Sequence, residues 1–216
     1  MTAGVLFSQM EPPAGTEEEF HHWYDTDHIP VRMAVPGFAA ASRYEAVEGS
    51  PRYLAIYELS DLAALQSPAY AKVKAEPSAA TTKMLGAVSG FTRYIGEEIA
   101  DSGPAGTTGP FIAVVAFAVP PSGEAEFDDW YDSEHSPLLL AAPDWLRVRR
   151  YRVIDGEGGP WTRLAVHELA NLEVMDSPER ARARQGPKRD ALAERPWFAN
   201  SGRWLYRRLN RVEAGS

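Results

Sequence analysis

One string of residues occurs twice in this chain, and the repetition constrains the fold more than any other feature of the sequence. The stretch EEFHHWYDTDHIP at 18–30 returns as AEFDDWYDSEHSP at 125–137, roughly half a chain length later. The correspondence continues in order, with Arg43-Tyr44 matching Arg150-Tyr151, LAIYEL (54–59) matching LAVHEL (164–169), and Ser67-Pro68 matching Ser177-Pro178. An ordered match along the whole chain predicts a tandem duplication of a unit of about 100 residues.

The two copies are separated by the stretch ADSGPAGTTG at 100–109, which is rich in glycine, proline and threonine. Such a composition is typical of a linker. We therefore expect a first repeat at 1–99, a linker at 100–109 and a second repeat at 110–211.

Each repeat has the same expected order of elements. GVLFSQM and FIAVVAFAV are β-rich runs, and TEEEFHHWYDTDH and GEAEFDDWYDSEH have the apolar spacing of amphipathic helices. Pro30 and Pro137 disfavour the α conformation just before them, so each helix is expected to end near its histidine. Two strands, a second helical stretch and a closing strand follow, at 38–47, 52–59, 69–86 and 89–97 in the first copy and at 145–153, 162–169, 179–193 and 201–209 in the second. The order βαββαβ predicts two ferredoxin-like units and an α+β fold.

The strands are apolar on both faces, since Leu54 and Ile56 alternate with Ala55 and Tyr57. Helices cover one face of a ferredoxin-like sheet, so the other face needs a second partner. Packing the open faces of the two units together buries both and can enclose a cavity. The expected architecture is an intrachain pseudo-dimeric barrel.

Composition and charge exclude several classes of function. The chain has no cysteine, which rules out disulfides, thiolate metal sites and cysteine nucleophiles. A net charge of −8 argues against nucleic-acid binding. The N-terminus lacks the pattern of a signal peptide or membrane span, so a cytoplasmic location without membrane partners is expected. The basic stretch 180–211 could face an acidic partner or the acidic first half of the chain, but it is interpreted as a solvated and partly self-paired helix face.

His28 and His135 are the candidate catalytic residues. On a helix, Asp25 lies three residues from His28 and Asp132 three residues from His135, so each carboxylate is expected to orient its imidazole and to favour its protonated form. An oriented imidazole is the commonest general acid/base. The alternative is structural, in which each histidine caps carbonyl groups at its helix end.

The substrate contacts are expected from aromatic and basic side chains. Arg43 and Arg150 would suit an anion anchor in the barrel, or would pair across strands with Glu58 and Glu168. Arg32, opposite Leu139 in the other copy, suggests that the first site handles an acidic substrate. The remaining expected substrate-binding residues are Trp23, Tyr24, Tyr57, Trp130, Tyr131 and His167. No metal site is expected, because the adjacent His21 and His22 point in different directions on a helix.

The paired βαββαβ pattern, together with W-Y-D-x-x-H-x-P followed by P-G-F and R-Y, resembles the dimeric α+β barrel superfamily and, within it, the EthD-like proteins. The resemblance covers nearly the whole chain, and it implies that the family's proposed active-site histidine falls on His28 and His135. In most of that group two chains form the barrel. Some members bind a haem, a possibility that the sequence leaves open, although no cofactor is expected.

The sequence and the resemblance together suggest a cofactor-independent small-molecule enzyme. It would act as an isomerase, cyclase, lyase or cofactor-free oxygenase on an apolar aromatic or polyketide-like substrate, with histidine moving the proton. The alternative is a non-catalytic ligand-binding or stress-response barrel. A homodimer of the pseudo-dimer is a further possibility, which the sequence does not decide.

Overall fold

The structure is a computed structural model that describes residues 1–215. The first repeat contains β1 (Gly4–Glu11), α1 (Glu17–Trp23), the π-helical turn η1 (Tyr24–His28), α2 (Ile29–Met33), β2 (Phe38–Glu48), β3 (Tyr53–Leu59), the short helix η2 (Leu62–Gln66), α3 (Pro68–Ala75), α4 (Ala79–Ala87) and β4 (Ser89–Ser102). The second contains β5 (Phe111–Phe117), η3 (Pro121–Gly123), α5 (Glu124–Trp130), the π-helical turn η4 (Tyr131–His135), α6 (Ser136–Leu140), β6 (Trp145–Glu157), β7 (Arg163–Leu169), η5 (Glu173–Asp176), α7 (Pro178–Ala183), α8 (Pro187–Ala193) and β8 (Ser201–Glu213). Among the described residues, none of these helices has both the length and the apolar character needed to cross a bilayer.

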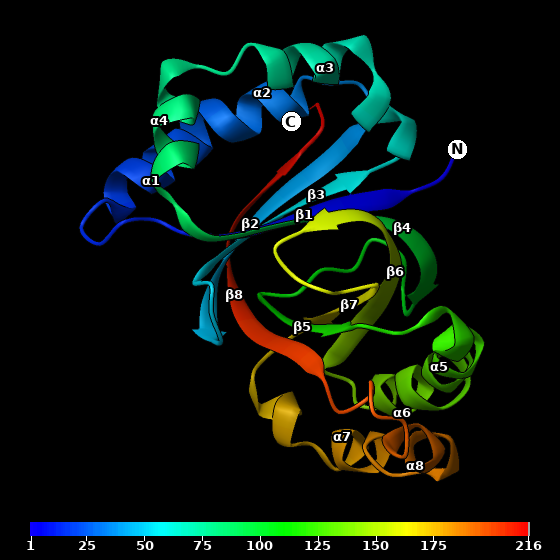
Figure 1. Ribbon diagram of the computed structural model, residues 1–216. Coiled ribbons are helices and arrows are strands. Elements are labelled where there is room, and N and C mark those ends of the chain that lie inside the picture. Colours follow the sequence, from blue (N-terminus) through cyan, green and yellow to red (C-terminus); the bar gives the residue numbers. More distant parts are fainter. Residues whose placement is uncertain (216) are drawn as a thin grey trace.

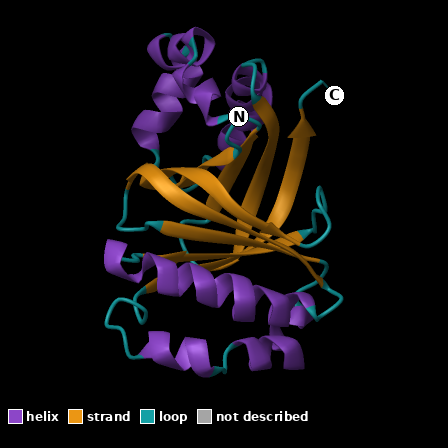
Figure 2. Ribbon diagram, turned by 90° about the vertical axis from the view of Figure 1, so that its right-hand side faces the viewer, coloured by secondary structure: helices purple, strands orange, loops and turns teal. Residues whose placement is uncertain are grey.

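The eight strands close into one antiparallel barrel in the order β1-β3-β2-β8-β5-β7-β6-β4. Each repeat contributes four neighbouring strands, and the seams are the pairs β2–β8 and β4–β6. The helices of the two repeats lie on opposite sides of the barrel (Figures 1 and 2). The predicted fold, two ferredoxin-like repeats forming an intrachain pseudo-dimeric α+β barrel, is confirmed.

The closing strands are longer than the sequence predicted. β4 continues to Ser102, which pairs with Val148, and β8 continues to Glu213, which pairs with Ala40. The first three residues of the expected linker, 100–102, are therefore strand. The extra residues extend because each seam strand finds hydrogen-bond partners in the other repeat.

Side chains fill the interior of the barrel. Tyr44, Tyr94, Tyr151 and Tyr206 are fully buried there, among smaller apolar residues from both repeats. The expectation of a cavity between the two open faces is therefore wrong, because bulky aromatic residues occupy the space. Two separate apolar cores lie between each half of the sheet and its own helices.

The repeated motif forms a π-helical turn in both copies. The Ile29 amide donates to the Tyr24 carbonyl, and the Ser136 amide donates to the Tyr131 carbonyl, five residues back in each case. The widened turn lets the helix continue through the following proline, which stands near the start of α2 or α6. The expectation that each helix ends near its histidine is wrong for this reason.

Candidate active site

A cavity of about 160 Å³ lies in the second repeat, between the sheet and helices α6 and α7. His135, from the end of η4, and His167, from β7, both line it. Its other walls are mainly apolar or basic, with Glu48 as the one acidic residue among those described, and include Ala113, Val115, Leu139, Trp145, Met175, Arg180, Arg184, Arg203 and Leu205. A smaller cavity of about 60 Å³ shares His135, Arg184 and Arg203 with it and adds Tyr131. Two predicted histidine positions and one predicted tyrosine thus line two neighbouring cavities.

The first repeat fills the equivalent region with larger side chains. Leu6 pairs with Tyr57 as Ala113 pairs with His167, so the second repeat has the smaller residue at both positions. Tyr70 occupies the third helical position after Ser67-Pro68, where the second copy has Arg180. The rings of Tyr57 and Tyr70 both pack against Phe38, at 5.9 and 5.5 Å. Divergence at these positions explains why the cavity beside His135 and His167 has larger side chains in its place in the first repeat.

His167 is neutral and its tautomer is fixed. The Trp145 indole N–H donates to Nδ1 over 3.2 Å, so Nε2 carries the proton and donates to the Tyr131 hydroxyl, also over 3.2 Å. His167 is 1% exposed, and burial lowers its pKa to about 3. Burial also raises the pKa of Tyr131, which keeps its hydroxyl protonated. The Tyr131 hydroxyl accepts one hydrogen bond and retains its own proton as a donor.

His135 lines the cavity and has one ring nitrogen without a protein partner among the described residues. Its Nδ1 lies 2.9 Å from the Ala183 carbonyl, the last residue of α7, so Nδ1 carries the proton and donates. Nε2 then has an unshared electron pair, and no protein group among the described residues is bonded to it. Burial lowers the pKa of His135 to about 4, against the opposing effect of the Ala183 bond. The ring stacks on Trp130, with centroids 4.4 Å apart.

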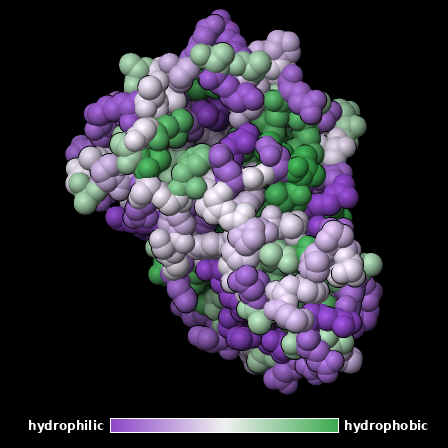
Figure 3. All heavy atoms as spheres, viewed as in Figure 1, coloured by the Kyte–Doolittle hydropathy of each residue, from purple (hydrophilic) through white to green (hydrophobic). Residues whose placement is uncertain are grey.

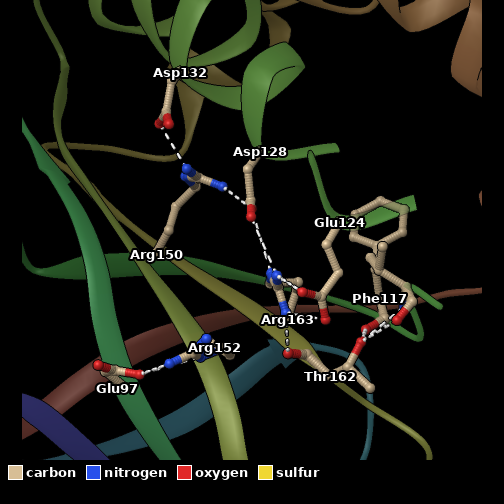
Figure 4. Close-up of polar contacts among 10 residues, drawn as sticks. Glu97, Phe117, Glu124, Asp128, Asp132, Arg150, Arg152, Thr162 and Arg163 are labelled. Atoms are coloured by element: carbon tan, nitrogen blue, oxygen red, sulfur yellow. Dashed lines mark hydrogen bonds and ion pairs between the residues drawn. The ribbon is translucent and has the colours of Figure 1, made fainter. Parts of the chain in front are cut away.

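The carboxylates of the motif do not orient the histidines. Asp132 is exposed and pairs with Arg150 over 2.7 Å, and Asp25 pairs with Arg43 over 2.9 Å and accepts from Asn210. Figure 4 shows Asp132 at the end of a chain of ion pairs through Arg150. The wider π turn separates residues three apart, so the predicted Asp–His pairs do not form. The pKa of His28 is well below its usual value, contrary to the expected protonated form, because of burial and of Arg32 and Arg43.

Arg43 and Arg150 face the helices rather than the barrel interior. Arg43 lies over the Tyr24 ring at 4.4 Å and donates to His21 Nδ1, while Arg150 lies over Tyr131 at 5.1 Å. In the second copy Asp128 replaces His21 and pairs with Arg150 over 2.8 Å. The predicted pairs with Glu58 and Glu168 are wrong. Those carboxylates bind Arg149, Arg208 and Arg211 on the opposite face of the sheet.

The predicted residues of the first repeat lie in its core. Trp23 donates to Thr81 over 2.9 Å, and the Tyr24 hydroxyl contacts the Met10 sulfur at 3.6 Å. His28 is 4% exposed, and its Nδ1 has no partner among the described residues. Arg32 donates to the His28 carbonyl and lies 5.7 Å from the Tyr57 ring. A hollow of about 270 Å³ between the helices contains Arg32 but neither His28 nor Tyr57 among its lining residues.

We expect His28→Phe to leave any activity of the second repeat unchanged. The ring packs 4.2 Å from Trp23 and its Nδ1 makes no hydrogen bond in the described structure, so an apolar ring of similar volume suits the site. The free energy of unfolding should change by less than about 1.5 kcal/mol. Urea unfolding measures it, and a loss of several kcal/mol would show that the imidazole has a polar role in the core.

The arginines at the cavity were missed from the sequence. Arg180, Arg184 and Arg203 line it, and Arg189 lines the smaller cavity beside it. The signal was present in the basic stretch 180–211, which was interpreted as a solvated face. Figure 3 shows why that interpretation is natural, since hydrophilic and neutral residues cover much of the lower helices. Only the fold brings the same arginines to a pocket that contains two histidines.

The residues around this cavity do not suit a metal ion or a haem. Among the described residues no group of three His, Asp or Glu side chains is placed to hold a metal ion. A cavity of about 160 Å³ is also smaller than the roughly 300–1,000 Å³ of sites that hold larger ligands. A haem does not fit with the side chains where they lie.

The buried histidines predict a loss of stability in acid. A histidine whose pKa is lower in the folded chain than in the unfolded chain stabilises the fold fully only above its unfolded pKa, which is 6.5. This stability is lost as the pH falls from 6.5 toward the pKa of the folded chain. His135 and His167 have folded values of about 4 and 3, and that of His28 is also well below 6.5. Urea unfolding should therefore show stability falling by up to about 1.4 kcal/mol per pH unit for each histidine. His167→Phe should flatten this slope, and a stability independent of pH between 6.5 and 4 would contradict it.

No protein-family profile and no curated protein matches the sequence. An anthrone oxidase-like protein has a similar structure, with TM-score 0.72 and 14% identity, over 100% of this chain and 94% of that one. A monooxygenase candidate from Lactobacillus acidophilus follows with TM-score 0.64 and 11% identity, over 100% and 98% of the two chains. A candidate chlorite dismutase has TM-score 0.62 and 12% identity, over 97% and 96%. At these identities the likeness shows the fold alone, which is that of the dimeric α+β barrel proteins, here within one chain.

Proposed function

We propose that the second repeat is the catalytic half of a small-molecule enzyme, and that His135 is its general base. The observation that carries this proposal is the hydrogen bond from His135 Nδ1 to the Ala183 carbonyl, which leaves Nε2 of this cavity-lining residue as an unprotonated acceptor. A base needs a defined tautomer and a free lone pair beside the substrate. His135 has both at neutral pH.

The reaction begins with proton transfer from the substrate to His135. Nε2 takes a proton from an acidic C–H next to a carbonyl, the C–H electron pair forms the C=C bond of an enolate, and the carbonyl π electrons move to oxygen. The Tyr131 hydroxyl, held by His167, is placed beside the same space and donates a hydrogen bond to that oxygen. These steps use side chains alone.

The enolate sets the range of reactions. It can be reprotonated at another carbon, expel a leaving group, attack a second carbonyl or react with molecular oxygen, which gives the isomerase, lyase, cyclase and cofactor-free oxygenase outcomes. Two similar structures are named as an anthrone oxidase-like protein and a monooxygenase, which supports the small-molecule enzyme class and oxygenation as one outcome. The EthD-like assignment, the tandem duplication, the cytoplasmic location and the homodimer remain predictions.

The cavity favours a small aromatic substrate. An engineered cavity of about 150 Å³ holds benzene, so about 160 Å³ encloses a single ring. The ring would contact Leu139, Trp145 and Met175, while polar substituents reach the histidines or the arginines at the other walls. A larger polyketide-like compound would have to extend through the opening.

The test uses phenylpyruvate, which joins one ring to a ketone with acidic benzylic C–H bonds. NMR would follow deuterium exchange at the benzylic carbon in D₂O, with and without protein. We expect exchange above the buffer rate, since His135 removes and returns the proton. Exchange at the buffer rate, or equal exchange in a His135→Gln variant, would reject the general-base role and leave the ligand-binding alternative.

A further inference from the structure

The arginines at the cavity differ from the others in this chain. Thirteen of the eighteen arginines form ion pairs with carboxylates in the described structure. Four of the other five, Arg180, Arg184, Arg189 and Arg203, line the two neighbouring cavities of the second repeat. A chain with net charge −8 has enough carboxylates to pair them, and it leaves them unpaired at one place.

Each of these guanidinium groups has at least one other of the four close enough to repel it. Burial is the main cause that lowers the pKa of Arg180 and of Arg203. The positive charge of Arg184 lowers both pKa values further, and Arg189 adds to the effect on Arg203. Like charges held together without partners cost stability. Such a cost is offset when an anion binds among them.

Few protein carboxylates face the cluster. Glu48, at the end of β2, lines the larger cavity, and it and Asp176 raise the pKa of Arg180 without forming an ion pair with it in the described structure. Arg180 donates to the Met175 carbonyl and Arg203 to the Ser201 hydroxyl, which are neutral acceptors. The positive charge of the arginines that line the cavity is therefore not neutralised by an ion pair in the described structure.

We propose that the second repeat selects small aromatic carboxylates, with the ring in the cavity and the carboxylate on Arg180, Arg184 and Arg203. This inference rests on the proposed function for its site but not for its test, which measures binding alone. Guanidinium groups bind carboxylates through paired N–H donors. The apolar side of the cavity, with Leu139, Met175 and Trp145, favours an organic anion over a small inorganic one.

The bound carboxylate would also act on the general base. Burial is the main cause of the low pKa of His135, and the positive charges of Arg180, Arg189 and Arg203 each lower it further. A carboxylate that neutralises these charges raises that pKa toward neutrality and makes His135 a stronger base only when the correct substrate is present. Binding of the substrate carboxylate to the arginines would then both select the substrate and activate His135.

The experiment compares the binding of benzoate, benzamide and inorganic phosphate by calorimetry. Benzamide matches benzoate in shape but lacks the charge, and phosphate has charge without a ring. We expect benzoate to bind at least about tenfold more tightly than benzamide, which corresponds to roughly 1.4 kcal/mol. Phosphate should compete weakly. Benzamide binding as tight as that of benzoate would overturn the proposal, and so would phosphate binding tighter than benzoate, which would indicate a phosphate site instead.

Variants locate the charge that matters. Arg180→Gln and Arg203→Gln should each weaken benzoate binding by about tenfold and leave benzamide binding unchanged. Arg182→Gln is the matched control, since Arg182 lies on the same helix, pairs with Glu179 and does not line the cavity. Circular dichroism checks that each variant is folded. Equal benzoate affinity in all three variants would reject the arginine site.

Exchange and benzoate binding test the general base and the arginine site independently. A His135→Gln variant should still bind benzoate, because the arginines remain. If it loses exchange while benzoate binding is insensitive to the arginines, the base is right and the anion site is wrong. If benzoate binding depends on the arginines but no exchange occurs, the cavity is an anion-binding site without catalysis.

Discussion

Replacing Arg149 by leucine should lower the free energy of unfolding by about 3–5 kcal/mol, a large share of the roughly 5–15 kcal/mol of a typical domain. The Arg149 guanidinium is 3% exposed and lies 3.1 Å from Glu58 of the first repeat and 3.4 Å from Glu168 of the second. Glu168 is fully buried and also binds Arg208 at 2.9 Å. Removing Arg149 leaves Glu58 with Arg211 and Glu168 with Arg208, but it takes away the buried guanidinium that binds both carboxylates. The loss of these two ion pairs, and the repulsion between the two carboxylates that Arg149 joined, is the cost.

The matched control is Arg207→Leu. Arg207 pairs with Glu45 over 2.8 Å, but its side chain is 57% exposed. An exposed pair contributes at most about 1 kcal/mol. Urea unfolding of both variants gives the comparison, and similar losses in the two would mean that the Arg149 network does not hold the repeats together.

The second large effect is expected at His135. His135→Gln should slow benzylic deuterium exchange of phenylpyruvate by about 10²–10⁴-fold, the usual contribution of a general base. The amide has no basic lone pair comparable to Nε2. The wild-type exchange rate should also fall in acid, as His135 takes up a proton near its pKa of about 4 in the free protein.

The control for this variant is His28→Gln, which changes the equivalent residue of the first repeat. No rate change is expected, because Leu6, Tyr57 and Tyr70 fill the space that is open around His135. A loss of exchange in His28→Gln, with His135→Gln unaffected, would move the active site to the first repeat.

Much of the fold follows from local patterns in the sequence. β-rich apolar runs, together with the match between the two copies, predicted all eight strands. Ser67-Pro68 and Ser177-Pro178 begin α3 and α7, where each serine hydroxyl accepts from the amide three residues on. The expectation that the helices end before Pro30 and Pro137 was wrong, because a π-helical turn precedes each proline and accommodates the missing N–H group. The spacing of apolar residues in the sequence does not reveal a π-helical turn.

The candidate site could be predicted only in part. His135, Tyr131 and His167 were expected and lie together, while Trp145 and the arginines around them were not expected. The face of Arg43 was undetermined, because both alternating sets of strand residues are apolar and alternation then does not say which set meets the helices. The same ambiguity assigned Glu58 and Glu168 to the wrong arginines.

The sequence by itself determined the two units, their order of elements and the pairing of their open faces, because these depend on periodicity and on turn residues close together in the chain. The tertiary structure alone decided which of the two equivalent histidines, His28 or His135, lines a cavity. That depends on the volumes of residues far apart in sequence, such as Ala113, His167 and Arg180 against Leu6, Tyr57 and Tyr70. It also decided that the arginines of α7 and β8 meet His135, since that contact forms only when the helices pack on the closed sheet.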